Sequence, residues 1–485
     1  MKMKSVLLLL FLTLSANAEL ENLVQINDNL NSTAQKSPSI ASDDIGNFYS
    51  IWIDYRNNKL GEIFFSKSED SGKTWSENKF IFNSDIPNSK FQRYATLKTH
   101  GDNLYVCWMS TVNAKIEVFF CKSTDKGETF TNPLIVSDDN SKYNQDFPVM
   151  NVDDNGGIHI AAIVNRNHEQ GKVSFAELMY THSTDEGETW SPNKIISNFN
   201  VNAGACECCW PAWDTYTDTD GNVTVAVLYR SNINNLRVSY LANSYDGGLN
   251  FEQPRRVGFE DWIIDFCPVS GPSIEYDNSG KLHMTYKTIS DIYYSSFDSN
   301  NPTNNETHIA SGDNPGLVFN EHTGRVYISY ENYESNRLQT RIVEVSQSNN
   351  VSSSNLILPM NSDISMSNLD MIFSNEKVYM NWEGETEGNE NSNIWFAEYI
   401  SKLSSVEYSI NASAIKTDNE GNLIISTNEF NTKLVISDLM GKILIEQELN
   451  IPVKDYIVDL SQLNFKVLLS NIISPRGNTS RIIIK

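Results

Sequence analysis

The chain has 485 residues, a length that at roughly 150 residues per domain allows either one large repeat architecture or two to three ordinary domains. Acidic residues outnumber basic ones 61 to 37, and the resulting formal charge of -24 excludes sequence-independent binding to nucleic acid and attraction to anionic lipid. Hydrophobic residues make up 40% of the sequence and charged residues 20%, which excludes compositional disorder and predicts a packed core.

Residues 1–18 have the pattern of a secretory signal peptide. Lys2 and Lys4 form the charged start, residues 6–14 the apolar run, and Ala16-Asn17-Ala18 the small-residue cleavage site. We therefore expect a secreted chain whose mature form starts near Glu19. No later stretch reaches the roughly 18 to 20 apolar residues of a transmembrane helix, so the chain is not expected to span a membrane.

Four segments of eight residues match one another closely, each with a serine first, an aspartate third, a glycine fifth and an aromatic residue eighth. They are Ser68–Trp75, Ser123–Phe130, Ser183–Trp190 and Ser244–Phe251. This spacing predicts a hairpin turn in which the aspartate accepts backbone hydrogen bonds and the glycine adopts a positive φ. The pattern resembles the Asp box (BNR repeat) of sialidase-like β-propellers, and we expect these aspartates to hold turns and to take no part in catalysis.

A second unit, a turn followed by an alternating apolar strand, recurs seven times at spacings of 44 to 65 residues. The copies are residues 47–53, 103–108, 157–162, 222–227, 281–286, 325–330 and 377–382. The spacing suits a four-stranded blade, and no amphipathic helix interrupts the series. We therefore predict an all-β fold, a seven-bladed propeller over residues 19–402, with six blades as the alternative. Residues 23–26 are expected to supply the missing strand of the last blade.

The pattern changes from about Ser404. Blade turns and Asp boxes end, and short β-rich segments follow, including residues 423–426 and 433–437 and the basic-apolar terminus Arg481–Lys485. Residues 403–485 resemble the C-terminal sorting domain that Bacteroidetes-type bacteria use for type IX secretion, which implies the secretion machinery as a partner. We predict a small C-terminal β-sandwich here, and the alternative to a sorting domain is an accessory β-sandwich.

Several cations follow the second strands of the blades, on the face where propellers hold their ligands. These loops carry Arg56, Arg166 with His168, Tyr229 and Arg230 with Arg237, and Arg337. A cluster of cations on an otherwise acidic protein favours an anionic substrate. Together with Trp210 and Tyr240, the arginines other than Arg230 are candidate substrate-binding residues. For Arg56 the alternative is an ion pair with its neighbour Asp54.

Four cysteines gather at the start of two adjacent predicted blades. Cys206, Cys208 and Cys209 precede Trp210 in the fourth blade, and Cys267 precedes the fifth. They can form two disulfides or hold a structural zinc ion, the fourth ligand being Cys267 or His168.

Other metal and packing assignments are weaker. Calcium can be assigned to no residue. Cys107 and Cys121 are expected on neighbouring strands, as a disulfide or as two buried thiols. His159 and His283 fall inside strands and are expected to pack.

Two enzyme families resemble this chain. In sialidases three arginines bind the sialate carboxylate, but Lys36-Ser37-Pro38 stands here where sialidases carry Arg-Ile-Pro. The blade count, the cysteine cluster and the pair His168 and Arg230 look more like the propeller ulvan lyases. That resemblance implies β-elimination on a uronate, with His168 as base or acid, Arg230 neutralising the carboxylate and Tyr229 as a substitute acid.

The leading hypothesis is therefore a secreted, monomeric carbon–oxygen lyase or dehydratase that degrades an acidic, ulvan-like poly- or oligosaccharide. The ulvan-lyase resemblance is incomplete, because Asp146-Phe147-Pro148 and residues 210–214 occupy positions where those lyases have another histidine and a tyrosine. The alternatives are a sialidase-type glycoside hydrolase and a noncatalytic glycan-binding propeller.

Overall fold

The structure is a computed structural model whose chain forms two compact units, Glu19–Ile400 and Ser401–Lys485 with Met1–Ala18. It describes residues 19–29, 33–57, 60–82, 90–138, 143–165, 176–197, 204–298, 301–334, 337–346, 351, 356–358, 365–385 and 391–400 of the first unit. Of the second it describes residues 413–417, 423–427, 432–437, 443–449, 453–458, 467–474 and 477–484. The signal-peptide prediction lies outside the described residues.

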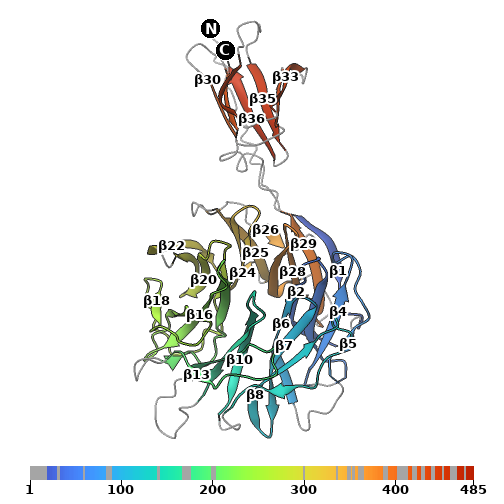
Figure 1. The fold of residues 1–485 in the computed structure, drawn as a ribbon, viewed down its shortest axis with the longest axis vertical. Coiled ribbons are helices and arrows are strands. Elements are labelled where there is room, and N and C mark those ends of the chain that lie inside the picture. Colours follow the sequence, from blue (N-terminus) through green and yellow to red (C-terminus); the bar gives the residue numbers. More distant parts are fainter. Residues whose placement is uncertain are drawn as a thin grey trace, which may run out of the picture. The chain divides into compact units, whose positions relative to one another are not determined.

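The first unit is a seven-bladed β-propeller built of antiparallel sheets, as predicted (Figure 1). Blade I is β2 (Gln35–Ser42), β3 (Phe48–Asp54), β4 (Glu62–Ser68) and β5 (Lys79–Phe80). Blade II is β6 (Lys90–His100), β7 (Asn103–Val112), β8 (Lys115–Ser123) and β9 (Leu134–Ile135). Blade III is β10 (Gln145–Val152), β11 (Ile158–Val164), β12 (Glu177–Ser183) and β13 (Lys194–Ile195). Blade IV is β15 (Ala212–Thr217), β16 (Val223–Asn232), β17 (Ser239–Ser244) and β18 (Arg255–Val257), with β14 (Gly204–Ala205) paired to the end of β16.

The last three blades follow the same order. Blade V is β19 (Ser273–Tyr276), β20 (Leu282–Thr288), β21 (Asp291–Asp298) and β22 (Asn301–Ser311), and blade VI is β23 (Asp313–Asn320), β24 (Arg325–Glu334), β25 (Arg337–Val345) and β26 (Leu356–Leu358). Blade VII is β27 (Ser367–Ser374), β28 (Lys377–Gly384), β29 (Asn393–Ile400) and β1 (Glu19–Gln25).

The ring closes through β1, the first described strand, which forms the outer edge of blade VII. Leu20 pairs with Tyr399 and Val24 with Phe396 in an antiparallel register. The predicted closing strand therefore exists, although it begins at Glu19 and not at Leu23. This pairing ties the start of the unit to its end.

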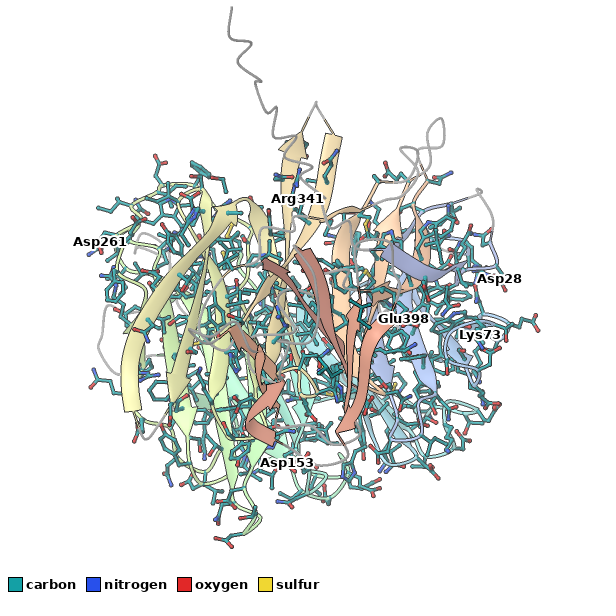
Figure 2. The ribbon with its side chains drawn as sticks, turned by 90° about the horizontal axis from the view of Figure 1, so that it is seen from above. Asp28, Lys73, Asp153, Asp261, Arg341 and Glu398 are labelled. Carbon is teal, nitrogen blue, oxygen red and sulfur yellow. A yellow bond between two sulfur atoms is a disulfide. The ribbon has the colours of Figure 1, made fainter. Side chains whose placement is uncertain are left out.

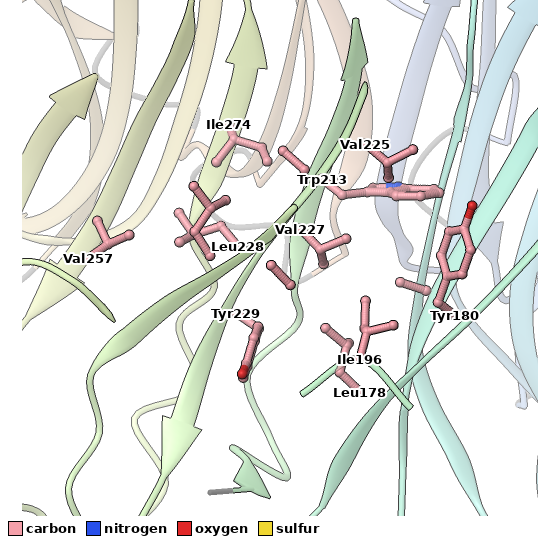
Figure 3. Packing of buried hydrophobic residues seen from close by; sticks show 14 of the residues in the cluster. Leu178, Tyr180, Ile196, Trp213, Val225, Val227, Leu228, Tyr229, Val257 and Ile274 are labelled. Carbon is pink, nitrogen blue, oxygen red and sulfur yellow. The ribbon is translucent and has the colours of Figure 1, made fainter. Parts of the chain in front are cut away.

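The core of the propeller lies between the blades. Every residue of β3 and β11 is buried, because a middle strand packs against a neighbouring blade on each face of its sheet. Figure 3 shows one such layer, in which Trp213, Val227 and Ile274 from blades IV and V pack with Leu178 and Ile196 of blade III. The strands of the second recurring unit are thus the main source of buried apolar surface.

The Asp boxes form the predicted turns. In blade I the Asp70 carboxylate accepts hydrogen bonds from the backbone N–H and the hydroxyl of Thr74, and these bonds lower the pKa of Asp70 to about 2. Gly72 has a φ of +82°. The box aromatic packs on the preceding blade: Trp75 meets the Phe396 ring of blade VII edge-on at 5.3 Å. The boxes therefore hold neighbouring blades together as well as turning the chain.

Two packing predictions are confirmed. Cys107 and Cys121 are free, buried thiols. His159 is buried between the Asp153 carboxylate and the Tyr180 hydroxyl, and His283 between Asp277 and Tyr294 in the same way. Within the described ranges no helix is long and apolar enough to cross a membrane.

The second unit contains two antiparallel sheets, consistent with the small β-sandwich that we predicted. One sheet has the order β30 (Ser413–Thr417), β31 (Leu423–Thr427), β34 (Val453–Val458), and the other β33 (Ile443–Leu449), β32 (Thr432–Ser437), β35 (Val467–Ser474), β36 (Gly477–Ile484).

Candidate active site at the mouth of the propeller channel

One backbone device is repeated at the start of the innermost strand in five blades. The residues Ser37, Tyr94, Phe147, Asn314 and Asn368 all have φ between 47° and 52°, and each lies where the pairing with the second strand shifts register. A β-bulge re-aims the side chain of the extra residue, and non-glycine residues with positive φ cluster at functional sites. All five bulge residues line one cavity of about 280 Å³.

The walls of this mouth cavity are aromatic on one side. The rings of Tyr94 and Phe147 lie 4.6 Å apart, and Trp210 of blade IV lines the same cavity. Gly271 makes room for that indole, because a Cβ there would lie 2.1 Å from Trp210 Nε1. Aromatic faces of this kind are suited to the apolar faces of a ligand, with a few polar groups fixing its orientation.

Carboxyl groups of blades VI and VII hold the bulges in place. Glu331 lines the cavity and accepts hydrogen bonds from Asn314 Nδ2 (2.7 Å) and the backbone N–H of Asn368 (3.1 Å). Glu383 accepts one from the N–H of Ser37 at 2.7 Å. Burial raises the pKa of both carboxyls. The two acids therefore link each blade to the bulge of the next.

Asp146 precedes Phe147, the bulge residue of blade III, and lies beside the mouth cavity without lining it. It is half-buried, lies close enough to Tyr94 to influence its ionisation, and accepts one hydrogen bond, from Asn165 Nδ2 at 3.1 Å. Burial raises the pKa of Asp146 to about 6. A carboxyl with such a pKa can carry and donate a proton near neutral pH.

Two cations occupy the positions in blades I and II that Asp146 occupies in blade III. Lys36 and Arg93 each stand immediately before a bulge residue, and both are exposed. Lys36 acts electrostatically on Glu383, and Arg93 acts on Tyr94. Our sequence analysis noted Lys36 but missed Arg93. The repeated position before each bulge is the signal that could have found it.

Below the mouth the channel continues as a cavity of about 530 Å³. Its wall holds three half-buried carboxyls, Asp214, Glu275 and Asp370, each accepting a backbone N–H from the innermost strand of the next blade. Burial raises the pKa of all three. Lys98 lines the same channel and acts electrostatically on each of them. These hydrogen bonds connect the innermost strands of neighbouring blades around the channel.

The structure places Arg230 and Tyr229 away from the mouth. Strand β16 continues to Asn232, so both residues lie inside a strand and not in the loop that we expected. Arg230 is 1% exposed, donates to the backbone carbonyls of Arg237, Ser270 and Lys287, and stacks on Trp262 at 4.9 Å. A substrate carboxylate cannot reach a guanidinium that the protein encloses in this way.

The other blade IV residues and Arg56 also have protein partners. The Tyr229 hydroxyl donates to the carbonyl of Ser197, and Tyr240 stacks on Tyr229 with ring centroids 6.2 Å apart. Arg56 pairs with Asp54 and with Asp28, which is labelled at the edge of the molecule in Figure 2. Arg56 therefore forms the ion pair with Asp54 that the sequence offered as its alternative role.

Three candidate residues lie beyond what the structure describes. His168 and Arg166 are outside the described residues, and so is the side chain of Arg337, whose backbone begins β25. Trp210 is the one candidate substrate-binding residue whose side chain is described and lines the mouth cavity.

The four clustered cysteines are partly oxidised. Cys208 and Cys267 form a disulfide, while Cys206 and Cys209 are free buried thiols whose sulfur atoms lie 3.0 Å apart. The guanidinium of Arg237, predicted to bind substrate, donates to Cys206 Sγ at 3.1 Å and pairs with Glu207. The sulfur atoms of Cys206, Cys208 and Cys209 all lie within 4.8 Å of one another, so the zinc site that the sequence suggested stays an alternative to the Cys208–Cys267 disulfide.

Comparison with known proteins shows no family for this chain. No family model and no curated protein matches the sequence. Solved structures that resemble it include a Dyadobacter fermentans protein of unknown function, with 13% identity over 79% of this chain and 99% of that chain and a TM-score of 0.49. A Penicillium chrysogenum α-L-arabinanase bound to arabinobiose has 14% identity over 67% and 98%, with a TM-score of 0.46. A Trypanosoma rangeli sialidase bound to the inhibitor DANA has 10% identity over 93% and 84%, with a TM-score of 0.43. At TM-scores below 0.5 these similarities do not bear on the reaction of this chain.

Proposed function

We propose that this protein is a carbohydrate-active enzyme, a glycoside hydrolase that cleaves an acidic oligosaccharide at the channel mouth. The observation that carries the proposal is Asp146, a half-buried carboxyl whose pKa of about 6 suits a general acid, beside a cavity walled by Tyr94, Phe147 and Trp210. Glycoside hydrolases commonly use one protonated and one ionised carboxyl on either side of the scissile bond.

The two carboxyl roles can be assigned from their surroundings. Among the described residues only one oxygen of Asp146 accepts a hydrogen bond, so its proton is available to the departing glycosidic oxygen. Glu331 accepts two hydrogen bonds, from Asn314 and Asn368, and such bonds favour its ionised form against the effect of burial. Glu331 is therefore the candidate for the second carboxyl, acting on the sugar or on a water molecule.

The substrate class follows from the rim. Lys36 and Arg93 are exposed cations, and neither is held in an ion pair within the described residues. An anionic sugar gains electrostatic attraction from them, whereas a neutral sugar does not. These two cations therefore support the acidic substrate that we predicted from the sequence.

The cation that the β-elimination hypothesis assigned to the uronate carboxylate, Arg230, is not available to a substrate. Elimination next to a uronate carboxylate requires a cation that neutralises it, and the arginine proposed for that role is enclosed by backbone carbonyls and Trp262. The predicted base, His168, lies outside the described residues.

The test is product analysis with the full-length protein. We expect incubation with sialosides, ulvan and uronate-containing oligosaccharides to release a reducing sugar from at least one acidic substrate without new ultraviolet absorbance. Asp146→Asn should abolish release, whereas Glu188→Gln, an exposed carboxyl on an Asp box, should leave it unchanged. An unsaturated product would establish the lyase instead, and binding without any product would refute catalysis.

We also propose that the protein is exported and sorted by type IX secretion. The support is the pattern of residues 1–18 and of the basic-apolar C-terminus. Fusing residues 403–485 to a periplasmic reporter in a type IX-competent bacterium tests this, and retention of the reporter in the periplasm would contradict it.

A further inference from the structure

The cysteine cluster combines a surface disulfide with a buried dithiol. Cys208 and Cys267 are half-buried, whereas Cys206 and Cys209 are at most 1% exposed. The Sγ of Cys206 lies 3.0 Å from that of Cys209 and 3.5 Å from that of Cys208. Cys206 is therefore in contact both with its dithiol partner and with one sulfur of the disulfide.

Two buried guanidinium groups surround these sulfurs. Arg237 donates to Cys206 Sγ at 3.1 Å, and Arg230 acts electrostatically on Cys209. Both arginines are at most 3% exposed, and the Nε of each has no partner among the described residues. Glu207 balances only one of the two positive charges. The hydrogen bond from Cys206 and the two arginines lower the pKa of Cys209, so Cys209 is the thiolate of the pair, and thiolates are the nucleophiles of disulfide exchange.

We propose that this cluster is a redox centre in which the buried Cys206/Cys209 pair exchanges electrons with small thiols and disulfides in solution through the Cys208–Cys267 disulfide. The half-buried disulfide is the part that solutes can reach. The contact distance of 3.5 Å between Cys206 and Cys208 is close to that required for attack. This centre is independent of the glycosidase proposal.

The exchange runs in two internal steps. Cys206 passes its proton to the Cys209 thiolate, to which it donates a hydrogen bond, and attacks Cys208 Sγ, which forms a Cys206–Cys208 disulfide and releases Cys267 as a thiolate. The Cys267 thiolate takes up that proton, and Cys209 then attacks Cys206 Sγ, which forms the Cys206–Cys209 disulfide and releases Cys208 as a thiolate. One disulfide and two reduced sulfurs are present before and after, so these steps transfer no net electrons.

The oxidising step takes place at the surface. A small disulfide accepts two electrons from Cys208 and Cys267, reforms their bond, and leaves as two thiols that carry the protons of the oxidised pair. The centre then holds two disulfides. Closing the bond between Cys206 and Cys209 shortens their separation from 3.0 Å to about 2.0 Å and pulls on Trp210, the next residue and a wall of the mouth cavity.

Thiol counting in the full-length protein tests the proposal. The state described here has four free cysteines, Cys107, Cys121, Cys206 and Cys209. After excess oxidised glutathione, denaturation and alkylation, we expect peptide mapping to show two labelled cysteines, Cys107 and Cys121, and a new Cys206–Cys209 disulfide. The buried core thiols are an internal control for unfolding. Labelled Cys206 and Cys209 after this treatment would overturn the proposal.

Two variants test the route. In Cys208→Ser/Cys267→Ser, oxidation of Cys206 and Cys209 should slow by more than about tenfold, because the oxidant cannot reach buried sulfurs directly. An unchanged rate would refute the relay. Because this variant has lost a disulfide and can fail to fold, Cys209→Ser supplies a second test: iodoacetamide added to the native variant should label Cys267 over time and trap a Cys206–Cys208 disulfide. Cys267 that stays unlabelled would contradict the first exchange step.

Metal analysis distinguishes the redox centre from a zinc site. Protein purified without chelator under reducing conditions should contain substoichiometric zinc. One zinc per chain with all four cluster cysteines reduced would overturn the redox centre and establish the zinc site in its place.

Discussion

The substitution Asp146→Asn has consequences for stability and for activity that have separate causes. Because burial raises the pKa of Asp146 from 3.8 to about 6, the folded state binds its proton more tightly than the unfolded state does. Ionisation of wild-type Asp146 therefore lowers the free energy of unfolding as pH rises from about 4 to about 6. Asparagine does not ionise, so the variant escapes this loss.

The magnitude follows from the pKa difference. Roughly two pKa units at about 1.4 kcal/mol each give an upper bound of about 3 kcal/mol, which the partial exposure of Asp146 reduces to about 2 kcal/mol. Urea unfolding at a series of pH values should show the variant more stable than wild type by this amount at pH 7.5. The gain should disappear at pH 4, where wild-type Asp146 is protonated.

Activity should change in the opposite direction. Loss of a general acid lowers kcat by about 10²- to 10⁴-fold. A general acid acts in its protonated form, so the acidic limb of the wild-type pH profile should be governed by a group other than Asp146. Steady-state assays on the best acidic substrate measure both effects. A variant that retains wild-type kcat would refute the role of Asp146, and a stability gain of equal size at pH 4 and pH 7.5 would refute its raised pKa.

Three further predictions test the site and the scaffold. Gly248→Ala should destabilise the propeller by more than about 2 kcal/mol in urea unfolding, because its φ is +85° and a Cβ would lie 1.7 Å from the Tyr180 hydroxyl; a loss below about 0.5 kcal/mol would contradict this packing. Arg230→Ala should lower the melting temperature and the free energy of unfolding by about 3 kcal/mol, because it leaves backbone carbonyls unsatisfied; a raised KM with unchanged stability would instead restore Arg230 to the substrate site. Lys36→Ala/Arg93→Ala should raise KM for an anionic substrate by about 3- to 10-fold and weaken its salt dependence without changing the melting temperature; equal KM values in the variant and wild type would argue against an anionic ligand.

Much of the architecture could be predicted because its signals are local. An Asp box is a turn whose aspartate bonds to residues four positions away, so the eight-residue pattern contains nearly all the interacting partners. The seven strand units are equally local, since alternation and turn residues specify a strand by themselves. The closing strand was found by counting, because blade VII offered three strands where the others offered four.

The site was harder to predict, because its partners come from distant parts of the chain. Arg230 looked like a loop cation, but β16 runs on through it, and its partners Ser270 and Lys287 lie 40 and 57 residues further along. Asp146 was noted only as occupying another family's catalytic position. Its pKa reflects burial at the mouth, which depends on how neighbouring blades pack and cannot be derived from the residues beside it.

The sequence by itself determined an all-β propeller and its box turns and favoured seven blades over six, because turns and strand periodicity depend on neighbours in the chain. It left the cysteine cluster open between disulfides and a metal site. Tertiary structure decided which of the polar residues face the channel mouth. Ring closure brings the starts of the innermost strands together, and the bulges there turn five side chains toward one cavity. Burial between blades then determines which charges bind the protein itself, as Arg230 does, and which stay exposed without an ion pair among the described residues, as Lys36 and Arg93 do.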